Sequence, residues 1–338
     1  MPVDTAEQLR QAFPEGLQEN APLAQYTAAR IGGPAEFLLT VRSADGLEAA
    51  ARRLWEMQVE FRILGGGSNV LIADAGVSGV VVLNQARAVR FGTELPERAK
   101  PRARPRRAQS SRRGVEGEPA ERVEGEPRVW AESGASLGGI ARRAAERGMS
   151  GLEWAATVPG SVGGAVVGNA GAHGGDTAGS LDRAGILHRE HGRREWGVDE
   201  LGFGYRTSWL KRNPGLAVVL NGGFRLERSD TESVRAKLAE FNEYRQRTQP
   251  TGASLGSMFQ NPPGDHAGRL IEAAGLKGAR RGEVEISTLH ANFFVNRGGG
   301  RASDVYALIQ LARQTVSKRF GVELELEIEL VGNWERHA

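Results

Sequence analysis

The stretch best suited to chemistry is rich in glycine and free of cationic side chains. Residues 151–176 read GLEWAATVPGSVGGAVVGNAGAHGGD, with eight glycines among 26 residues and no lysine or arginine. Glycine leaves backbone N–H groups uncovered and reaches positive φ without strain, so such a run can fold its amides around a buried anion. Val158, Val162 and Val166 supply apolar packing that a flexible linker lacks. We therefore expect a buried element that cradles a phosphate-bearing ligand rather than a plain surface loop.

A second glycine-rich run, GGGSN at 65–69, directly follows a predicted strand at residues 60–64. A Rossmann domain would carry GxGxxG here at the start of a helix, followed later by an acidic residue. In this chain Val70 occupies the third glycine position, and apolar, strand-like sequence follows. The run is therefore interpreted as a ligand-cradling loop, with a tight hairpin turn as the alternative, and a Rossmann nicotinamide domain is disfavoured.

Composition indicates a soluble globular protein of two or three domains. The 338 residues are 40% hydrophobic and 25% charged, which is ordinary for such proteins. No apolar run approaches the roughly 18 residues that span a bilayer, and the N-terminus lacks a secretory apolar core, so a cytoplasmic protein without membrane insertion is expected. The absence of cysteine excludes disulfides, a thiol nucleophile and cysteine-bound zinc. No HExxH pair occurs, so no catalytic metal site is expected.

The basic charge of the chain belongs to one segment. Residues 98–113 hold eight basic residues and no acidic one; without them the net charge of +3 becomes −5. The surrounding residues 94–128 contain almost no apolar side chains, so we expect a low-complexity insertion that is disordered or a flexible hairpin tip. We interpret it as an insertion without function and expect no nucleic acid to bind.

Apolar periodicity predicts mixed helices and strands, and so an α+β fold. Helices are predicted at residues 6–13, 46–58, 137–147, 231–246, 267–274 and 302–320, with Asp45 capping the second. Strands are predicted at residues 60–64, 70–72, 80–83, 129–131, 186–188, 194–196, 218–220, 224–226, 284–286 and 293–295. The run ELELEIEL at 323–330 alternates strictly, which predicts a final strand with four glutamates on one face.

Seven segments, in order along the chain, resemble the UDP-N-acetylenolpyruvoylglucosamine reductases. They are TAARIGGPAEF (27–37), ILGGGSNVLI (63–72), GLEWAATVPGSVGGAVVGNAGAHGG (151–175), YRTSWLK (205–211), GSMFQNP (256–262), LHANFFVN (289–296) and LELEIELVG (324–332). The resemblance covers nearly the whole chain outside residues 94–128. It implies a two-part FAD-binding domain of the vanillyl-alcohol-oxidase-like class, at residues 1–84 and 85–228, followed by a substrate-binding α+β domain at 229–338. The short path from Lys211 to Val218 is typical of the family's compact form.

The family reduces UDP-N-acetylglucosamine enolpyruvate to UDP-N-acetylmuramate, a step in making peptidoglycan precursors. The resemblance implies non-covalent FAD as cofactor and NADPH as co-substrate, with hydride delivered to the enolpyruvyl β-carbon. Such a step needs a cation near the substrate carboxylate and a proton donor at the α-carbon. By their places in the matching segments, Ser257 is the implied proton donor, Arg206 the implied cation and Glu327 the implied acid. Periodicity alone does not choose among the four glutamates of the tail.

The resemblance also implies binding residues, and a monomer is expected. Residues expected to bind FAD lie in or beside the two glycine-rich runs: Gly65, Gly66, Gly67, Ser68, Asn69, Val70, Pro159, Gly160, Ser161, Gly163, Gly164, Asn169, Gly171 and Ala172. Residues expected to contact the sugar-nucleotide substrate are Tyr205, Gln260, Asn261 and His290. His290 is equally well interpreted as a structural histidine.

Two other interpretations remain open. The first is a different non-covalent FAD oxidoreductase on the same scaffold, which would turn over other enol ethers or alcohols. The second is a flavin-free protein that binds nucleic acid through residues 98–113; it would be colourless, and its affinity for DNA would fall steeply with salt.

Overall fold

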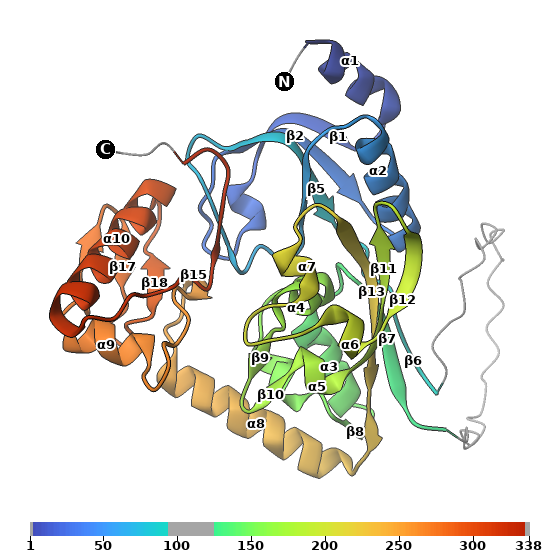
Figure 1. The fold of residues 1–338 in the computed structure, drawn as a ribbon. Coiled ribbons are helices and arrows are strands. Elements are labelled where there is room, and N and C mark those ends of the chain that lie inside the picture. The colour runs from blue at the N-terminus through green and yellow to red at the C-terminus, as the bar shows by residue number, and fades with distance from the viewer. Residues whose placement is uncertain (1–2, 94–124, 335–338) are drawn as a thin grey trace, which may run out of the picture.

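A computed structural model of the chain describes residues 3–93 and 125–334 (Figure 1). Helices and strands are mixed along its length, which confirms the expected α+β class. Most of the predicted insertion, residues 94–124, lies outside the described residues. In the described ranges no helix is both long and apolar enough to cross a bilayer.

The first sheet has four strands in the order β1 (Leu17–Pro22), β2 (Pro34–Val41), β5 (Val77–Asn84) and β3 (Phe61–Leu64). Strands β2, β5 and β3 run parallel, whereas β1 is antiparallel to β2. The helical segments of this part are α1 (Val3–Ala12), η1 (Ala24–Tyr26) and α2 (Ala44–Glu56).

Helix α2 lies between the first two sheets. It buries the face predicted from its periodicity, which includes Leu47 and Leu54, in a core shared with Val218 and Leu220 of the second sheet. The predicted cap is wrong: Ser43 caps the helix, because its side chain accepts a hydrogen bond from the Gly46 N–H at 3.0 Å. Asp45 lies two residues after the cap and is in the first turn of the helix instead.

The second sheet is antiparallel throughout, in the order β12 (Gly192–Trp196), β11 (Leu181–His188), β13 (Ala217–Arg225), β7 (Arg128–Glu132) and β6 (Val89–Gly92). The two strands predicted at 218–220 and 224–226 form one strand, β13, because it pairs with β11 and β7 across Gly222 and Gly223. Its helices are α3 (Leu137–Ala145), η2 (Glu153–Thr157), α4 (Val162–Gly168), α5 (Thr177–Ser180), α6 (Val198–Leu201) and α7 (Trp209–Arg212). Short pairings join β8 (Met149–Ser150) to β14 (Glu227–Arg228) and β9 (Gly171–Ala172) to β10 (Gly175–Asp176).

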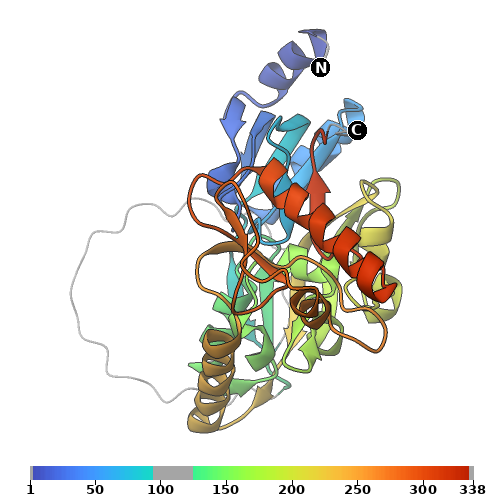
Figure 2. The ribbon, with the colours of Figure 1, turned by 90° about the vertical axis from the view of Figure 1, so that its left-hand side faces the viewer.

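Helix α8 (Thr231–Thr248) connects this region to the third sheet and runs along one side of the molecule in Figure 1. The third sheet is antiparallel, in the order β15 (Ala253–Ser257), β18 (Phe293–Asn296), β17 (Val284–Ile286) and β16 (Arg280–Arg281). Helices α9 (Ala267–Ala273) and α10 (Ala302–Phe320) pack with it, and α10 faces the viewer in Figure 2. Ala29, Ile31 and Leu71 from the first part of the chain complete this core.

The tail is a correction to the predicted strand at 323–330. Only β19 (Glu329–Val331) is a strand, and it pairs in parallel with β4 (Val70–Ile72) of the first part. The preceding residues make a single bridge between Leu326 and Phe259. Leu324 and Ile328 are buried as the alternation predicts, but within residues 3–93 and 125–334 no strand pairs with this part of the tail in a ladder.

Candidate active site

The two glycine-rich runs lie against each other. GGGSN forms the loop between β3 and β4, and Gly160 immediately precedes the cap of α4. A Cβ added at Gly66 would approach the Gly160 Cα to 2.8 Å, and the Ser68 hydroxyl donates to the Pro159 carbonyl at 3.3 Å. Gly67 has a φ of +59° and passes so close to the Tyr26 carbonyl that no side chain fits. Glycine is therefore required where the loops touch.

Backbone donors are left uncovered at this contact. The N–H groups of Gly66, Gly67, Ser68, Gly160 and Ser161 donate to no acceptor in the described part of the chain. Successive N–H groups without internal partners form an anion-binding concavity. The pyrophosphate of FAD suits such donors, because they can bind its charge without a lysine or arginine side chain. The residues present at this place therefore fit FAD.

Several of the other residues predicted to bind FAD make structural contacts within the chain. Gly65 packs so that a Cβ would meet the Ser161 hydroxyl, while Gly163 and Gly164 donate to the Ser133 carbonyl and to that same hydroxyl. Val70 begins β4, and Gly171 and Ala172 form β9.

Arg206 occupies a tight turn that Gly204 and Thr207 close by two mutual backbone hydrogen bonds of 3.0 and 3.2 Å. Its φ is +57°, a conformation that residues with a side chain adopt rarely. Its Nε donates to Oε1 of Glu327 at 2.7 Å, and its Nη2 donates to the Gly171 carbonyl at 2.9 Å. The guanidinium also lies 5.2 Å from the ring of Tyr205.

Two hydrogen bonds fix the backbone of Glu327 to other parts of the chain. Its N–H donates to the Met258 carbonyl at 2.9 Å, and its carbonyl accepts from the Asn69 side chain at 3.1 Å. The first contact places Glu327 beside Ser257, the residue before Met258. Arg206 and Glu327 are thus in direct contact, and Ser257 is next in sequence to a residue that is hydrogen-bonded to Glu327, although the three come from different parts of the chain. Glu327 is also the half-buried member of its row, whereas Glu323, Glu325 and Glu329 are exposed.

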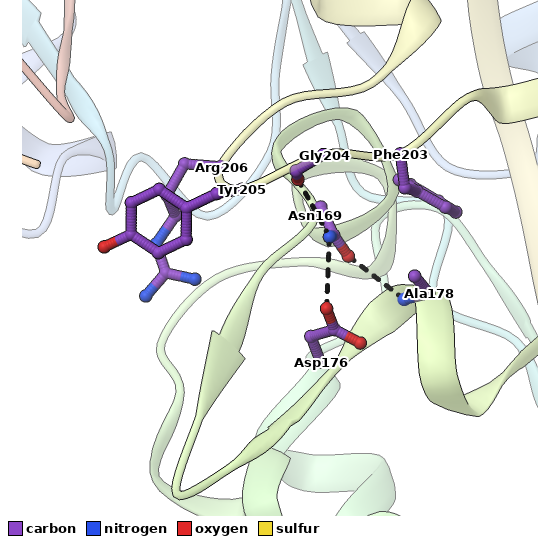
Figure 3. Close-up of a pocket in the computed structure, with 7 residues that line it drawn as sticks. All are labelled: Asn169, Asp176, Ala178, Phe203, Gly204, Tyr205 and Arg206. Atoms are coloured by element: carbon purple, nitrogen blue, oxygen red, sulfur yellow. Dashed lines mark hydrogen bonds between the residues drawn. The ribbon is translucent and has the colours of Figure 1, made fainter. Parts of the chain in front are cut away.

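A pocket of about 370 Å³ opens beside the turn. Figure 3 shows Asn169 at its centre, where the side-chain amide donates to the Gly204 carbonyl at 3.0 Å and to Asp176 at 3.2 Å. The Asn169 carbonyl oxygen accepts from the Ala178 N–H at 3.0 Å. Asn169 therefore fixes the glycine-rich stretch to the arginine turn, and its contact with FAD stays a prediction.

The predicted substrate residues differ in their surroundings. The Gln260 side chain donates to the Leu326 carbonyl at 3.2 Å, so it lies along the tail. Asn261 accepts from the Ala267 N–H at the start of α9. His290 accepts from the Asn292 N–H through Nδ1, and burial lowers the pKa of its imidazole. The last two residues thus already have local structural partners. Tyr205, in contrast, is 57% exposed beside Arg206.

Sequence reasoning missed His173, at the tip between β9 and β10. Its ring stacks on Phe241 of α8 with 4.2 Å between centroids, and its Nε2 lies 3.2 Å from the Thr157 hydroxyl. Burial lowers the pKa of His173. Nothing in the sequence predicted this contact, because Phe241 belongs to a distant helix whose exposed face carries mostly charged residues.

Comparison with known proteins agrees with this arrangement. Residues 247–331 match the family domain described as "UDP-N-acetylenolpyruvoylglucosamine reductase, C-terminal domain", and residues 120–184 match an "FAD binding domain". The chain is 42% identical to the UDP-N-acetylenolpyruvoylglucosamine reductase of Chloroflexus aggregans over 96% of this chain and 100% of that protein. It is 38% identical to the reductase of Bacillus subtilis, over 93% of each chain.

A solved structure agrees over the same span. The crystal structure of the reductase from Thermus caldophilus superposes with a TM-score of 0.71 at 33% identity, covering 92% of this chain and 97% of that one. An FAD-binding part followed by the family's C-terminal domain confirms the expected fold. The chain therefore belongs to the UDP-N-acetylenolpyruvoylglucosamine reductase family.

Proposed function

We propose that this chain carries out the family's reaction, with Arg206, Ser257 and Glu327 acting on the substrate. The reaction is the NADPH-dependent reduction of UDP-N-acetylglucosamine enolpyruvate to UDP-N-acetylmuramate, which supplies a peptidoglycan precursor. FAD, when bound, supplies the hydride that it receives from NADPH. The loops at Gly66 and Gly160 would hold its pyrophosphate through their uncovered N–H groups.

The chain's own residues would manage the charge and the proton. As hydride reaches the β-carbon, negative charge develops at the α-carbon and the adjacent carboxylate, which the Arg206 guanidinium stabilises. Glu327 holds that guanidinium at 2.7 Å, and the side chains of both stay partly exposed, at 24% for Arg206 and 18% for Glu327. The Ser257 hydroxyl then donates its proton to the α-carbon.

The observation that carries this proposal is the Arg206–Glu327 ion pair, with Ser257 next in sequence to a residue that is hydrogen-bonded to Glu327. The Arg206–Glu327 ion pair and the hydrogen bond from the Glu327 N–H to the Met258 carbonyl join the turn, the tail and the end of β15. The substrate needs a cation and a proton donor close to the same few atoms, and the proximity of these chain segments supports that assignment.

Rapid-mixing measurements of the two half-reactions test the proposal: reduction of the flavin by NADPH, and reoxidation of the flavin by the enolpyruvyl substrate. In Ser257→Ala, NADPH should bleach the flavin as fast as in the parent, while anaerobic recovery of the yellow colour on adding the enolpyruvyl sugar nucleotide should be blocked. Fast recovery in this variant would show that Ser257 is not the proton donor.

Assembly, location and domain bounds complete the proposal. We propose a monomeric cytoplasmic enzyme with domains at residues 1–84, 85–228 and 229–338. In support of the domain bounds, the strands of each of the three large sheets fall within one of these ranges.

A further inference from the structure

A second basic side chain holds the backbone of Arg206. The ammonium group of Lys211, on α7, donates to the carbonyl oxygen of Arg206 at 2.9 Å. Lys211 is half-buried, so this contact is partly shielded from water. A hydrogen bond from an ionised donor is stronger than one between neutral groups, which makes it suited to fixing a backbone position.

The turn that Lys211 contacts has a strained backbone conformation at Arg206. Arg206 stands at a position of the Gly204–Thr207 turn with φ of +57°, where glycine is the favoured residue. A side chain in this region of φ is strained, and it persists only where the surroundings hold it. The guanidinium of Arg206 reaches Glu327 and the Gly171 carbonyl together from this conformation.

The turn is clamped at both ends. Asn169 donates to the carbonyl of Gly204, at the start of the turn, as Figure 3 shows. Lys211 donates to the carbonyl of Arg206, near its end. Because the two clamps come from different elements, they restrain the turn independently.

The contacts of Ser208 explain why the Lys211 side chain lies near the backbone of Arg206, which precedes it in the chain. The fully buried Ser208 hydroxyl donates to the Val167 carbonyl of α4 at 2.7 Å and accepts from the Lys211 N–H at 3.3 Å. It therefore caps α7 and anchors it to α4, so that one helical turn carries the Lys211 side chain back over Arg206. This accounts for the arginine, serine and lysine spacing in YRTSWLK.

We propose that Lys211 is a positioning residue for substrate reduction, which it serves by keeping Arg206 in its left-handed conformation. The proposal rests on the role of Arg206 given above. Without the ammonium group the turn relaxes, and the guanidinium moves away from its place beside Glu327. A displacement of about 1 Å in a group that binds the transition state can lower the rate about 100-fold.

The test uses the holoenzyme with the two half-reactions measured separately. In Lys211→Met we expect unchanged flavin content and unchanged flavin reduction by NADPH, but reoxidation by the enolpyruvyl substrate slowed about 10- to 100-fold. Lys211→Arg should recover part of the rate, because a guanidinium can also donate to the carbonyl. Lys318→Met, an exposed lysine on α10, is the matched control and should leave both half-reactions unchanged. Lost flavin or a lower Tm in Lys211→Met, without recovery in Lys211→Arg, would overturn the proposal in favour of a general structural role.

A double-mutant cycle separates action through Arg206 from action on the substrate. In an Arg206→Ala background, adding Lys211→Met should slow reoxidation no further. An additive loss would show that Lys211 acts independently and would overturn the proposal. If flavin reoxidation is slow in Arg206→Ala but as fast as in the parent in Lys211→Met, only the role proposed for Lys211 is wrong. If Arg206→Ala alone reoxidises fast, the roles proposed for both residues fall together.

Discussion

The Nε–H of Arg206 donates to the carboxylate of Glu327 over 2.7 Å, although the two residues are 121 positions apart in the chain. The contact joins a turn beside the second sheet to the tail that follows α10. It also separates Glu327 from the other glutamates of the tail, which the alternating sequence leaves equivalent.

Replacing Glu327 should impair substrate reduction selectively. Glu327→Gln removes the charge that holds the Arg206 guanidinium, so reoxidation of the flavin by substrate should slow by about 100-fold or more, as when an acid–base group is lost. Reduction of the flavin by NADPH should be unaffected. Glu325→Gln is the control, because that exposed side chain lies two residues away on the same segment. Equal rates in the two variants would contradict the assignment of Glu327.

Alanine at the contact between the glycine loops should weaken flavin binding. In Gly66→Ala the new Cβ would come within 2.8 Å of the Gly160 Cα, so one loop must move. We expect the dissociation constant of FAD to rise about 10-fold, equivalent to about 1.4 kcal/mol, measured by titrating apoprotein. Gly168→Ala is the matched control in the other glycine-rich run, since nothing lies within 4 Å of its Cβ. If both variants hold FAD as tightly as the parent, the loops do not form the cradle.

Asp74, in the first part of the chain, should stabilise α10 in the third part by capping its N-terminus. Its carboxylate accepts from the Ala302 and Ser303 N–H groups at 2.8 and 2.9 Å, at the start of α10. Asp74→Asn should lower the free energy of unfolding by about 1 kcal/mol at pH 7, measured by urea denaturation. Asp45→Asn is the control, because Asp45 is exposed and its carboxylate contacts Arg193 at 3.5 Å instead of capping a helix. A similar loss in both variants would show that the capping contact has no special role.

The effect of Asp74 should also depend on pH. Burial acts to raise the pKa of Asp74, but the hydrogen bonds from Ser303 and Ala302 outweigh it and bring the pKa below its ordinary value of 3.8. A lowered pKa in the folded state means that the stabilisation is fully present above pH 3.8 and is lost as the pH falls through the folded value. The difference between the parent and Asp74→Asn should therefore shrink below pH 3.8.

Removing residues 94–124 should leave the flavoenzyme intact. Gly92 pairs with Arg128 in the β6–β7 ladder, and Gly125 lies close to Thr93. Joining Thr93 directly to Gly125 would leave the four residues Thr93, Gly125, Glu126 and Pro127 between that pair, a common length for a hairpin loop. We expect an unchanged flavin spectrum and turnover. A colourless or inactive product would show that the insertion is needed, and DNA binding by the parent but not by this variant would favour the nucleic-acid interpretation.

Periodicity predicted most helices and strands because their buried faces repeat within one element. Helix α10 begins and ends where predicted, at Ala302 and Phe320. In the tail, periodicity predicts the burial of Leu324 and Ile328 but not the strand bounds, because pairing depends on a distant strand, and only Glu329–Val331 pairs, with β4. Asp45 and Ser43 are both of residue types that cap helices, and because they lie two positions apart, only the bond from the Gly46 N–H to the Ser43 hydroxyl distinguishes them.

The sequence predicts some features of the candidate site, whereas others are visible only in the folded structure. The composition of the two glycine runs predicts a ligand cradle. In the structure these runs contact each other and leave backbone N–H groups without acceptors among the described residues. Arg206, Ser257 and Glu327 were identified by resemblance alone, since nothing local marks them. Lys211 lies in a matching segment, but its proposed role rests on the hydrogen bond from its ammonium group to the Arg206 carbonyl, which the sequence does not predict.

The bond between the Asn69 side chain and the Glu327 carbonyl has a kinetic consequence. These residues lie 258 positions apart, so closing this contact requires a loop that includes most of the chain. Contacts of such long sequence separation form slowly, because the entropy of loop closure opposes them until the intervening parts are compact. The separate sheets can therefore form first, while the loop at residues 65–69 and the backbone of the tail at Glu327 meet late. A partly folded chain would thus lack the complete catalytic group, and recovery of activity on refolding should lag behind recovery of secondary structure.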